Sequence, residues 1–70
     1  MVTKKVYVAF PSDTSYDGCI LIAADSLDEA KEMVNEKNKT VCDCLISAPE
    51  LVNGMTYEGD ESMILVDGIY

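Results

Sequence analysis

The alternation of apolar and polar residues predicts two β-strands in the first third of the chain. Residues 4–10 alternate between a face of two valines and a phenylalanine and a face of lysine, tyrosine and alanine, which is typical of a half-buried strand. Residues 11–18 are rich in turn-forming residues and predict a loop. Residues 19–24 are apolar at every position. We therefore expect them to form a short strand that is covered on both faces.

A capping box predicts that a helix begins at Ser26. The Ser26 hydroxyl can accept a hydrogen bond from the N–H of Glu29, and the Glu29 carboxylate can reach back to the N–H of Ser26. At about 100° per residue, the apolar side chains that follow form one stripe and the carboxylates form a separate face. Lysines and asparagines in residues 35–39 suit the negative end of the helix dipole, so we expect the helix to end near residue 37.

The second half of the chain predicts further strands. Residues 40–52 form a β-like stretch that is broken or bent at Pro49. Asn53-Gly54 is the strongest short-range signal for a type I′ turn. We therefore expect a hairpin in which residues 51–52 pair with residues 55–57.

Residues 58–61 predict one more turn, and residues 62–70 predict a last strand that Asp67-Gly68 ends or bulges. The expected order is β, β, α, β, β, β in a single domain, residues 1–70. The predicted fold class is α+β, a mostly antiparallel sheet of four to five strands with one helix packed on one face. The core is small, so a homodimer that buries more apolar surface is an open alternative.

The charge of the chain narrows the choice of partners. Its 70 residues hold 13 acidic residues and 5 lysines, with no arginine or histidine, for a net charge of −8. Nucleic acid and anionic membranes are polyanions that are bound through lysine and arginine, so we expect neither as a direct partner. A basic protein surface is expected instead. No apolar segment approaches the length of a membrane span or a signal-peptide core, so we expect a cytoplasmic protein.

The residue types present argue against catalysis and against a metal site. Without histidine or arginine, the chain lacks a group that titrates near neutrality and a bidentate anion clamp, so we expect no enzyme and no cofactor. A structural zinc site needs four ligands, whereas the chain offers three cysteines and no histidine. Cys42 and Cys44 share one face of a strand, where small apolar side chains pack in a core. An odd count that includes Cys19 fits reduced thiols.

Two groups of carboxylates are the candidate functional feature. The first lies on the predicted helix and just before it, at a spacing of about one helical turn, roughly 5.4 Å along the axis. The second lies in the turn of residues 58–61. Such an array can imitate the charges of a nucleic-acid backbone, and the alternative is that the acids only keep the protein soluble. The candidate partner-binding residues are Asp25, Asp28, Glu29, Glu32, Glu36, Glu58, Asp60 and Glu61.

The N-terminal half also resembles a group of known proteins. Val6-Tyr7-Val8, Tyr16-Asp17, the apolar residues 20–24 and the run from Asp25 to Ala30 resemble short uncharacterised proteins of bacteriophages and prophages. The resemblance implies a class of non-enzymatic binders of host machinery. Several acidic members of that class, anti-CRISPR and anti-restriction proteins among them, look like DNA to their target. The resemblance assigns no individual functional residue.

These observations predict a phage-type inhibitor that occludes the basic surface of a host nuclease, DNA-binding complex or defence protein in the bacterial cytoplasm. One alternative is a structural or assembly module that pairs with itself or with a partner through an open sheet edge, with the acids serving solubility alone. A second alternative is a sponge for a small ligand or a metal.

Overall fold

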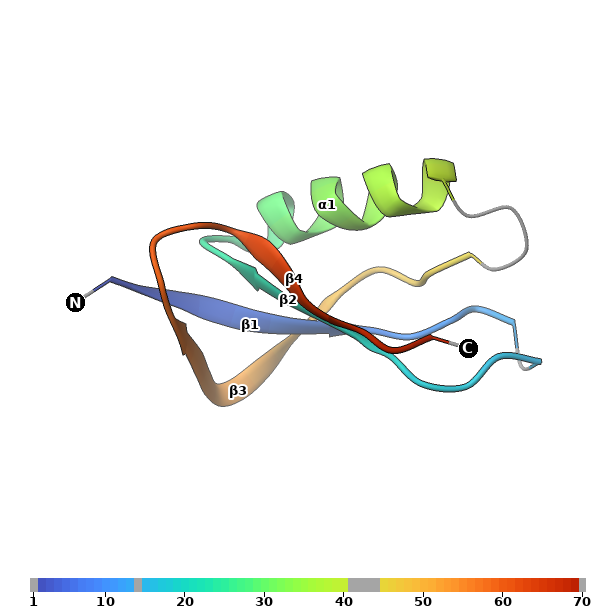
Figure 1. Cartoon of the computed structure of the whole chain (residues 1–70), viewed down its shortest axis with the longest axis horizontal. Helices are drawn as coiled ribbons and strands as arrows, with labels where there is room; N and C mark the ends of the chain where they lie inside the picture. Colours follow the sequence, from blue (N-terminus) through green and yellow to red (C-terminus); the bar gives the residue numbers. More distant parts are fainter. Residues whose placement is uncertain (1, 14, 41–44, 70) are drawn as a thin grey trace.

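One antiparallel sheet with one helix on one of its faces forms the described part of the chain (Figure 1). The computed structural model describes residues 2–13, 15–40 and 45–69. The elements in chain order are β1 (Thr3–Ala9), β2 (Ile20–Ala24), α1 (Leu27–Thr40), β3 (Glu50–Glu58) and β4 (Met63–Asp67). The sheet order is β3-β1-β2-β4. The predicted α+β class is confirmed, as is the antiparallel pairing.

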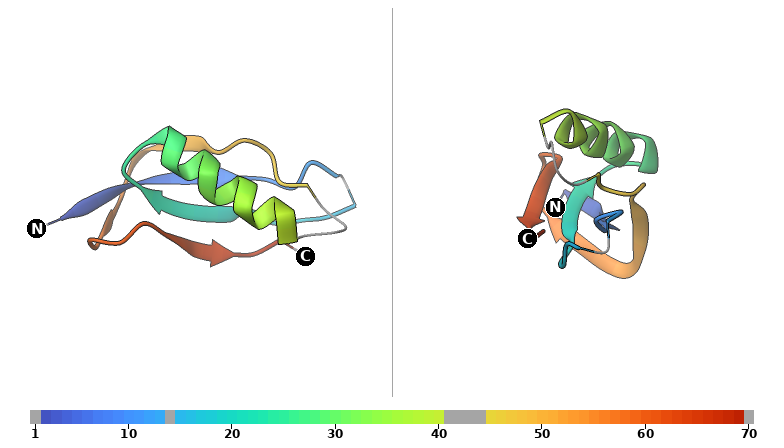
Figure 2. Two further views of the ribbon diagram at one scale, coloured as in Figure 1. Left: turned by 90° about the horizontal axis from the view of Figure 1, so that it is seen from above. Right: turned by 90° about the vertical axis from the view of Figure 1, so that its right-hand side faces the viewer.

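The two central strands are the two that the N-terminal pattern predicts. β1 and β2 pair in register from Lys5 opposite Ala24 to Ala9 opposite Ile20. β2 is covered on both faces, as expected, because Ile20 and Ile22 on one face and Ala23 on the other are fully buried, and Leu21 is partly buried. Figure 2 shows α1 above these central strands and β3 curling towards the opposite face. The uniformly apolar strand therefore lies inside the sheet between two strands.

The main core lies between the central strands and the helix. Tyr7 and Ile22 are cross-strand partners on the face that α1 covers, and Ala30 and Val34 of α1 pack with them in one buried cluster. Val6 lies on the opposite face and is also buried. On that face the Tyr57 hydroxyl reaches the Met63 sulfur, at 3.7 Å, which brings the two edge strands together.

β3 corrects the predicted hairpin. It runs without a turn through Asn53 and Gly54 and pairs with β1 on both sides of them. Between these paired stretches the register shifts, leaving residues 52–55 opposite Val6 as a bulge. A type I′ turn needs two residues with positive φ, but in the described chain only glycines have it, Gly54 at φ 80° among them. Asn53-Gly54 therefore bends one strand, and the order becomes β, β, α, β, β.

The ends of α1 confirm one prediction and correct another. The helix begins after Ser26, whose Oγ accepts a hydrogen bond from the N–H of Glu29 at 3.2 Å. It continues past the expected end near residue 37 to Thr40. The reason is Asn38, whose amide donates to the carbonyl of Ile46 at 3.1 Å and whose Oδ1 accepts from the N–H of Ile46 at 2.8 Å. These two hydrogen bonds connect the last turn of the helix to the segment before β3, a tertiary contact that helix propensity alone does not reveal.

The segment before β3 is less regular than predicted. Of the expected strand 40–52, residues 41–44 lie outside the described residues, and residues 45–49 make one isolated bridge, between Ile46 and Pro11. The expected packing of Cys42 and Cys44 therefore stays a prediction, while Cys19 is half-buried and free. The turn around residues 59–61 and the last strand are found where expected. No helix in the described ranges is long and apolar enough to cross a membrane.

Candidate functional site

Lys4 is a buried cation at the end of the sheet where β2 leads into α1. It follows the register of β1 and β2, which sets it opposite Asp25, the residue after β2. Its Nζ lies 2.9 Å from both carboxylate oxygens of Asp25, and its side chain is 8% exposed, against 61% for Asp25. The hydrogen bond to Asp25 raises the pKa of Lys4 above its usual 10.5, against the lowering effect of desolvation. Lys4 therefore holds Asp25 at the rim of the sheet.

Glu29 connects this ion pair to the segment between β3 and β4. One of its carboxylate oxygens accepts a hydrogen bond from the N–H of Asp25 at 3.2 Å, and the same oxygen accepts from the hydroxyl of Ser62. The capping box is thus present, but the carboxylate reaches the residue before Ser26. Because Ser62 directly precedes β4, the start of α1 is held against the β3–β4 turn.

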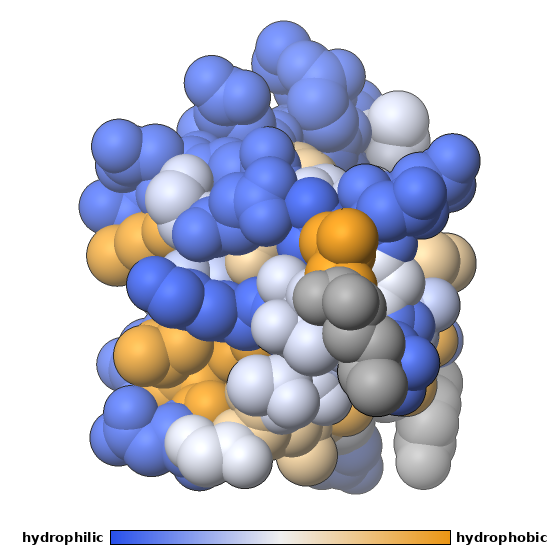
Figure 3. Space-filling model, turned by 90° about the vertical axis from the view of Figure 1, so that its left-hand side faces the viewer, coloured by the Kyte–Doolittle hydropathy of each residue, from blue (hydrophilic) through white to orange (hydrophobic). Residues whose placement is uncertain are grey.

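The two predicted acidic groups meet at this end of the molecule. Besides Asp25, the carboxylates of Glu29 and Asp60 also act electrostatically on Lys4 and raise its pKa. Glu58 and Asp60 line a shallow hollow of about 350 Å³ beside Val2. Figure 3 looks at this end, where hydrophilic residues cover the upper part, on the side of α1. We call it the acidic end and define it by Asp25, Glu29, Glu58 and Asp60.

The remaining predicted site residues lie next to the acidic end or further along α1. Asp28, Glu32 and Glu61 are exposed, and their side chains form no hydrogen bond or ion pair with other described residues. Glu36 is exposed too, but Lys39 pairs with it at 3.0 Å. The predicted acidic face of the helix is therefore split, since Asp25 and Glu29 are held by neighbouring elements whereas Asp28 and Glu32 are exposed to solvent.

The lysines reinforce this distribution of charge. Besides Lys4 and Lys39, Lys37 also has a carboxylate partner, Asp67. Lys5 and Lys31 form no ion pair with described residues. Three of the five lysines are therefore neutralised by carboxylates of the same molecule, and unpaired carboxylates, those at the acidic end and on α1 among them, give the surface its net negative charge.

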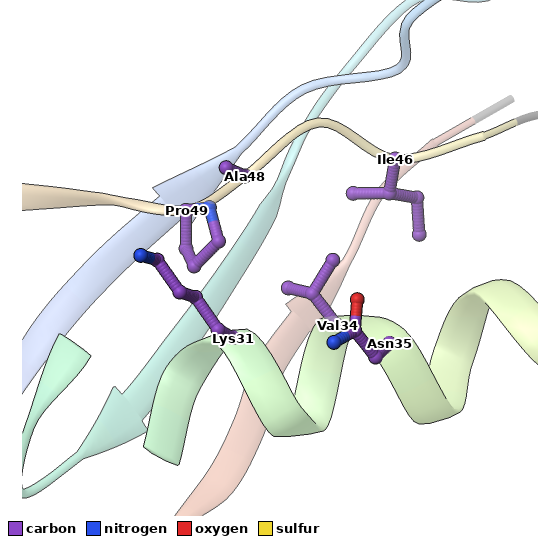
Figure 4. A pocket seen from close by; sticks show the side chains of 6 residues that line it. All are labelled: Lys31, Val34, Asn35, Ile46, Ala48 and Pro49. Atoms are coloured by element: carbon purple, nitrogen blue, oxygen red, sulfur yellow. The ribbon is translucent and has the colours of Figure 1, made fainter. Parts of the chain in front are cut away.

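A second hollow lies at the other side of α1 and offers little chemistry. It has a volume of about 180 Å³ between the helix and the segment that leads into β3 (Figure 4). Val34, Ile46 and Pro49 form its apolar wall, and Lys31 and Asn35 stand at its rim. Within the described residues, no group of three or more cysteine, aspartate or glutamate side chains could hold a metal ion. Neither hollow presents a nucleophile beside a base.

Sequence reasoning missed two residues that organise the acidic end. Lys4 shares the face of Val6 by strand alternation, and this alternation was the signal that it would be buried. Ser62 carried no such signal, because its bond to Glu29 exists only once the β3–β4 turn is brought beside α1 by the sheet order.

No protein-family model, curated protein or solved structure shows a significant match to the chain.

Proposed function

We propose that the protein is a non-enzymatic inhibitor of phage type that binds the basic surface of a nucleic-acid-handling or defence protein of a bacterial host. The observation that carries the proposal is the meeting of the two acidic groups at the acidic end, although they are far apart in the sequence. Inhibition occurs by occlusion, because the bound protein covers the groove through which the target contacts nucleic acid. No chemical step is involved, and the protein acts in the cytoplasm.

The positions of the unpaired carboxylates support this role. Asp28 and Glu32 are four residues apart on α1, which corresponds to one turn, or about 6 Å along the axis. Glu61 lies beside Asp60 on the β3–β4 turn, so the acidic surface extends from the helix to that turn. Carboxylates on separate rigid elements present charge over a surface, as a nucleic-acid backbone does, and such a field raises the association rate with a basic partner.

The fixed carboxylates add preorganisation. Asp25 is held by Lys4, and Glu29 is held by Ser62 and by the N–H of Asp25. Side chains already fixed before binding lose less conformational entropy when a partner arrives. The acidic end therefore combines fixed carboxylates with solvent-exposed ones around them.

The test is a pull-down from bacterial lysate with stepwise salt elution, followed by displacement with duplex DNA. We expect a nucleic-acid-binding or defence protein to be retained at low salt, released as ionic strength rises, and displaced by DNA. The double variant Asp28→Lys with Glu32→Lys should no longer retain this protein, because it replaces two exposed carboxylates of the acidic surface with lysines. Both side chains lie outside the hydrogen-bond network of the acidic end, so the fold should be preserved.

A matched control uses two exposed acidic residues elsewhere, Asp17→Lys with Glu50→Lys, which changes the net charge by the same amount. The control should retain the target. Equal loss in both variants would show that overall charge, and not this surface, governs capture. A partner that neither salt nor DNA releases would contradict the proposal and favour the assembly module.

A further inference from the structure

The hollow between α1 and the segment before β3 has no reactive group, but it has the size and the lining of a site for one side chain. Val34 and Ile46, which line it, are 2% and 6% exposed, so its floor belongs to the core of the protein. Its volume of about 180 Å³ is smaller than the roughly 300–1,000 Å³ of sites that enclose a whole small molecule. Small apolar pockets at a protein surface receive the anchor side chains of interfaces. The hollow therefore suits a single apolar side chain of a partner.

Lys31 gives the rim of the hollow a positive charge. Figure 4 shows its side chain leaning from α1 towards Pro49, and it has no ion-pair partner among the described residues. A lysine at this place repels a second cation, whereas it attracts the face of an aromatic ring. Asn35 stands at the rim one turn further along α1, where its amide can donate a hydrogen bond to a carbonyl of an arriving segment. The rim therefore favours an aromatic side chain over a basic or an aliphatic one.

Two exposed carboxylates stand beside the hollow on the same helix. At 100° per residue, Asp28 lies about 20° from Asn35 and about 60° from Lys31 around the helix axis. Glu32 lies about 40° beyond Asp28, on the side away from the hollow. Both carboxylates are exposed and have no partner among the described side chains. Basic residues of a partner can therefore meet these carboxylates while a neighbouring side chain enters the hollow.

We propose that the hollow receives one aromatic side chain of the partner, and that lysine or arginine residues next to it in the partner's sequence meet Asp28 and Glu32. The ring lies on Val34 and Ile46, with the ammonium group of Lys31 over its face. This inference rests on the proposed function and names what the basic partner must carry, an aromatic residue flanked by basic ones. A basic surface without such a residue would be bound by charge alone.

The test uses three capped peptides of equal charge and the full-length protein. Each peptide has two lysines on either side of a central residue, which is phenylalanine, leucine or glycine. We expect the phenylalanine peptide to bind about tenfold more tightly than the glycine peptide, and about threefold more tightly than the leucine peptide. Its ring should also shift the NMR signals of the methyl groups of Val34 and Ala48, which line the hollow.

Two variants that each remove one positive charge locate the ring. Lys31→Gln changes the rim of the hollow, whereas Lys5→Gln changes β1, at another exposed lysine that forms no ion pair with described residues. The added negative charge acts on all three peptides alike, so the ratio of two affinities isolates the ring. We expect Lys31→Gln to remove the threefold preference for phenylalanine over leucine, and Lys5→Gln to leave it unchanged. Circular dichroism and the melting temperature verify that both variants are folded.

The outcomes separate this inference from the proposed function. Equal binding of the three peptides, released by salt and without shifts at Val34 and Ala48, would overturn the anchor site while leaving the acidic surface as the binding site. A leucine peptide that binds as tightly as the phenylalanine peptide, or a preference that survives Lys31→Gln, would overturn the selection of a ring by Lys31. The absence of any binding of these cationic peptides at low salt would count against both proposals.

Discussion

The two ends of the molecule are held together by different kinds of contact. At the acidic end, charged side chains connect the elements, through Lys4 with Asp25 and through Glu29 with Ser62. At the other end, backbone atoms take part in nearly every connection, including the bonds of Ser12 N–H to the Leu45 carbonyl at 2.6 Å and of Ser47 N–H to the Phe10 carbonyl at 2.8 Å. Contacts between charged groups depend on pH and salt, whereas hydrogen bonds between backbone groups depend on the conformation of the chain. The end proposed to meet a partner therefore depends more strongly on solution conditions than the other end, where Lys37 and Asp67 form an ion pair.

The largest loss of stability is expected from Gly18→Ala, at the end of the molecule opposite the acidic end. Gly18 has φ 95°, and a Cβ there would lie 1.8 Å from the carbonyl oxygen of Gly68. We expect a loss of about 3 kcal/mol in the free energy of unfolding, from strain together with displacement of the backbone. Chemical denaturation at two salt concentrations measures it, and the loss should be the same at both.

Gly54→Ala is the control for this loss. Gly54 also has positive φ, 80°, but a Cβ there would meet no atom within 4 Å. Strain alone should cost about 1 kcal/mol. An equal cost at both glycines would show that the close approach of Gly18 to Gly68 contributes nothing.

A smaller loss in the free energy of unfolding is expected from Asn38→Ala, at the end of the molecule opposite the acidic end. The substitution leaves both the N–H and the carbonyl of Ile46 without their side-chain partner. We expect a cost of about 2 kcal/mol, measured by urea denaturation. Asn35→Ala on the same helix is exposed and should change stability by less than about 0.5 kcal/mol. A cost at Asn38 no greater than that at Asn35 would contradict the role of this clamp.

The smallest effect is expected at the acidic end, and it depends on pH. Because the pKa of Lys4 is raised in the folded state, its ion pair stabilises fully below the usual value of 10.5 and is lost as pH rises through the higher folded value. Lys4→Met should therefore lower the melting temperature relative to the wild type at pH 8, with the difference shrinking above pH 10.5. Lys5→Met, at an exposed lysine without an ion pair to described residues, should lower the melting temperature less than Lys4→Met does at pH 8.

Local signals in the sequence predicted the parts of the fold that local interactions decide. The start of α1 follows from Ser26 and Glu29, which are close along the chain, and β2 follows from a continuous apolar run. The hairpin predicted at Asn53-Gly54 was wrong because this dipeptide occurs both in hairpin turns and in bulges. Pairing of β3 with β1 decides which of the two forms. The candidate carboxylates were visible in the sequence. Their meeting was not, because it depends on the sheet order.

The contact between Gly18 and Gly68 has a consequence for how this sequence can diverge. The carbonyl of Gly68 is held in place because the N–H of the same residue bonds to the carbonyl of Cys19 at 3.1 Å. A relative with a side chain at position 18 would have to move the chain that follows β4 away and give up that bond. The loop before β2 and the chain after β4 should therefore evolve together, and divergent homologues should either keep the glycine at position 18 or alter both segments.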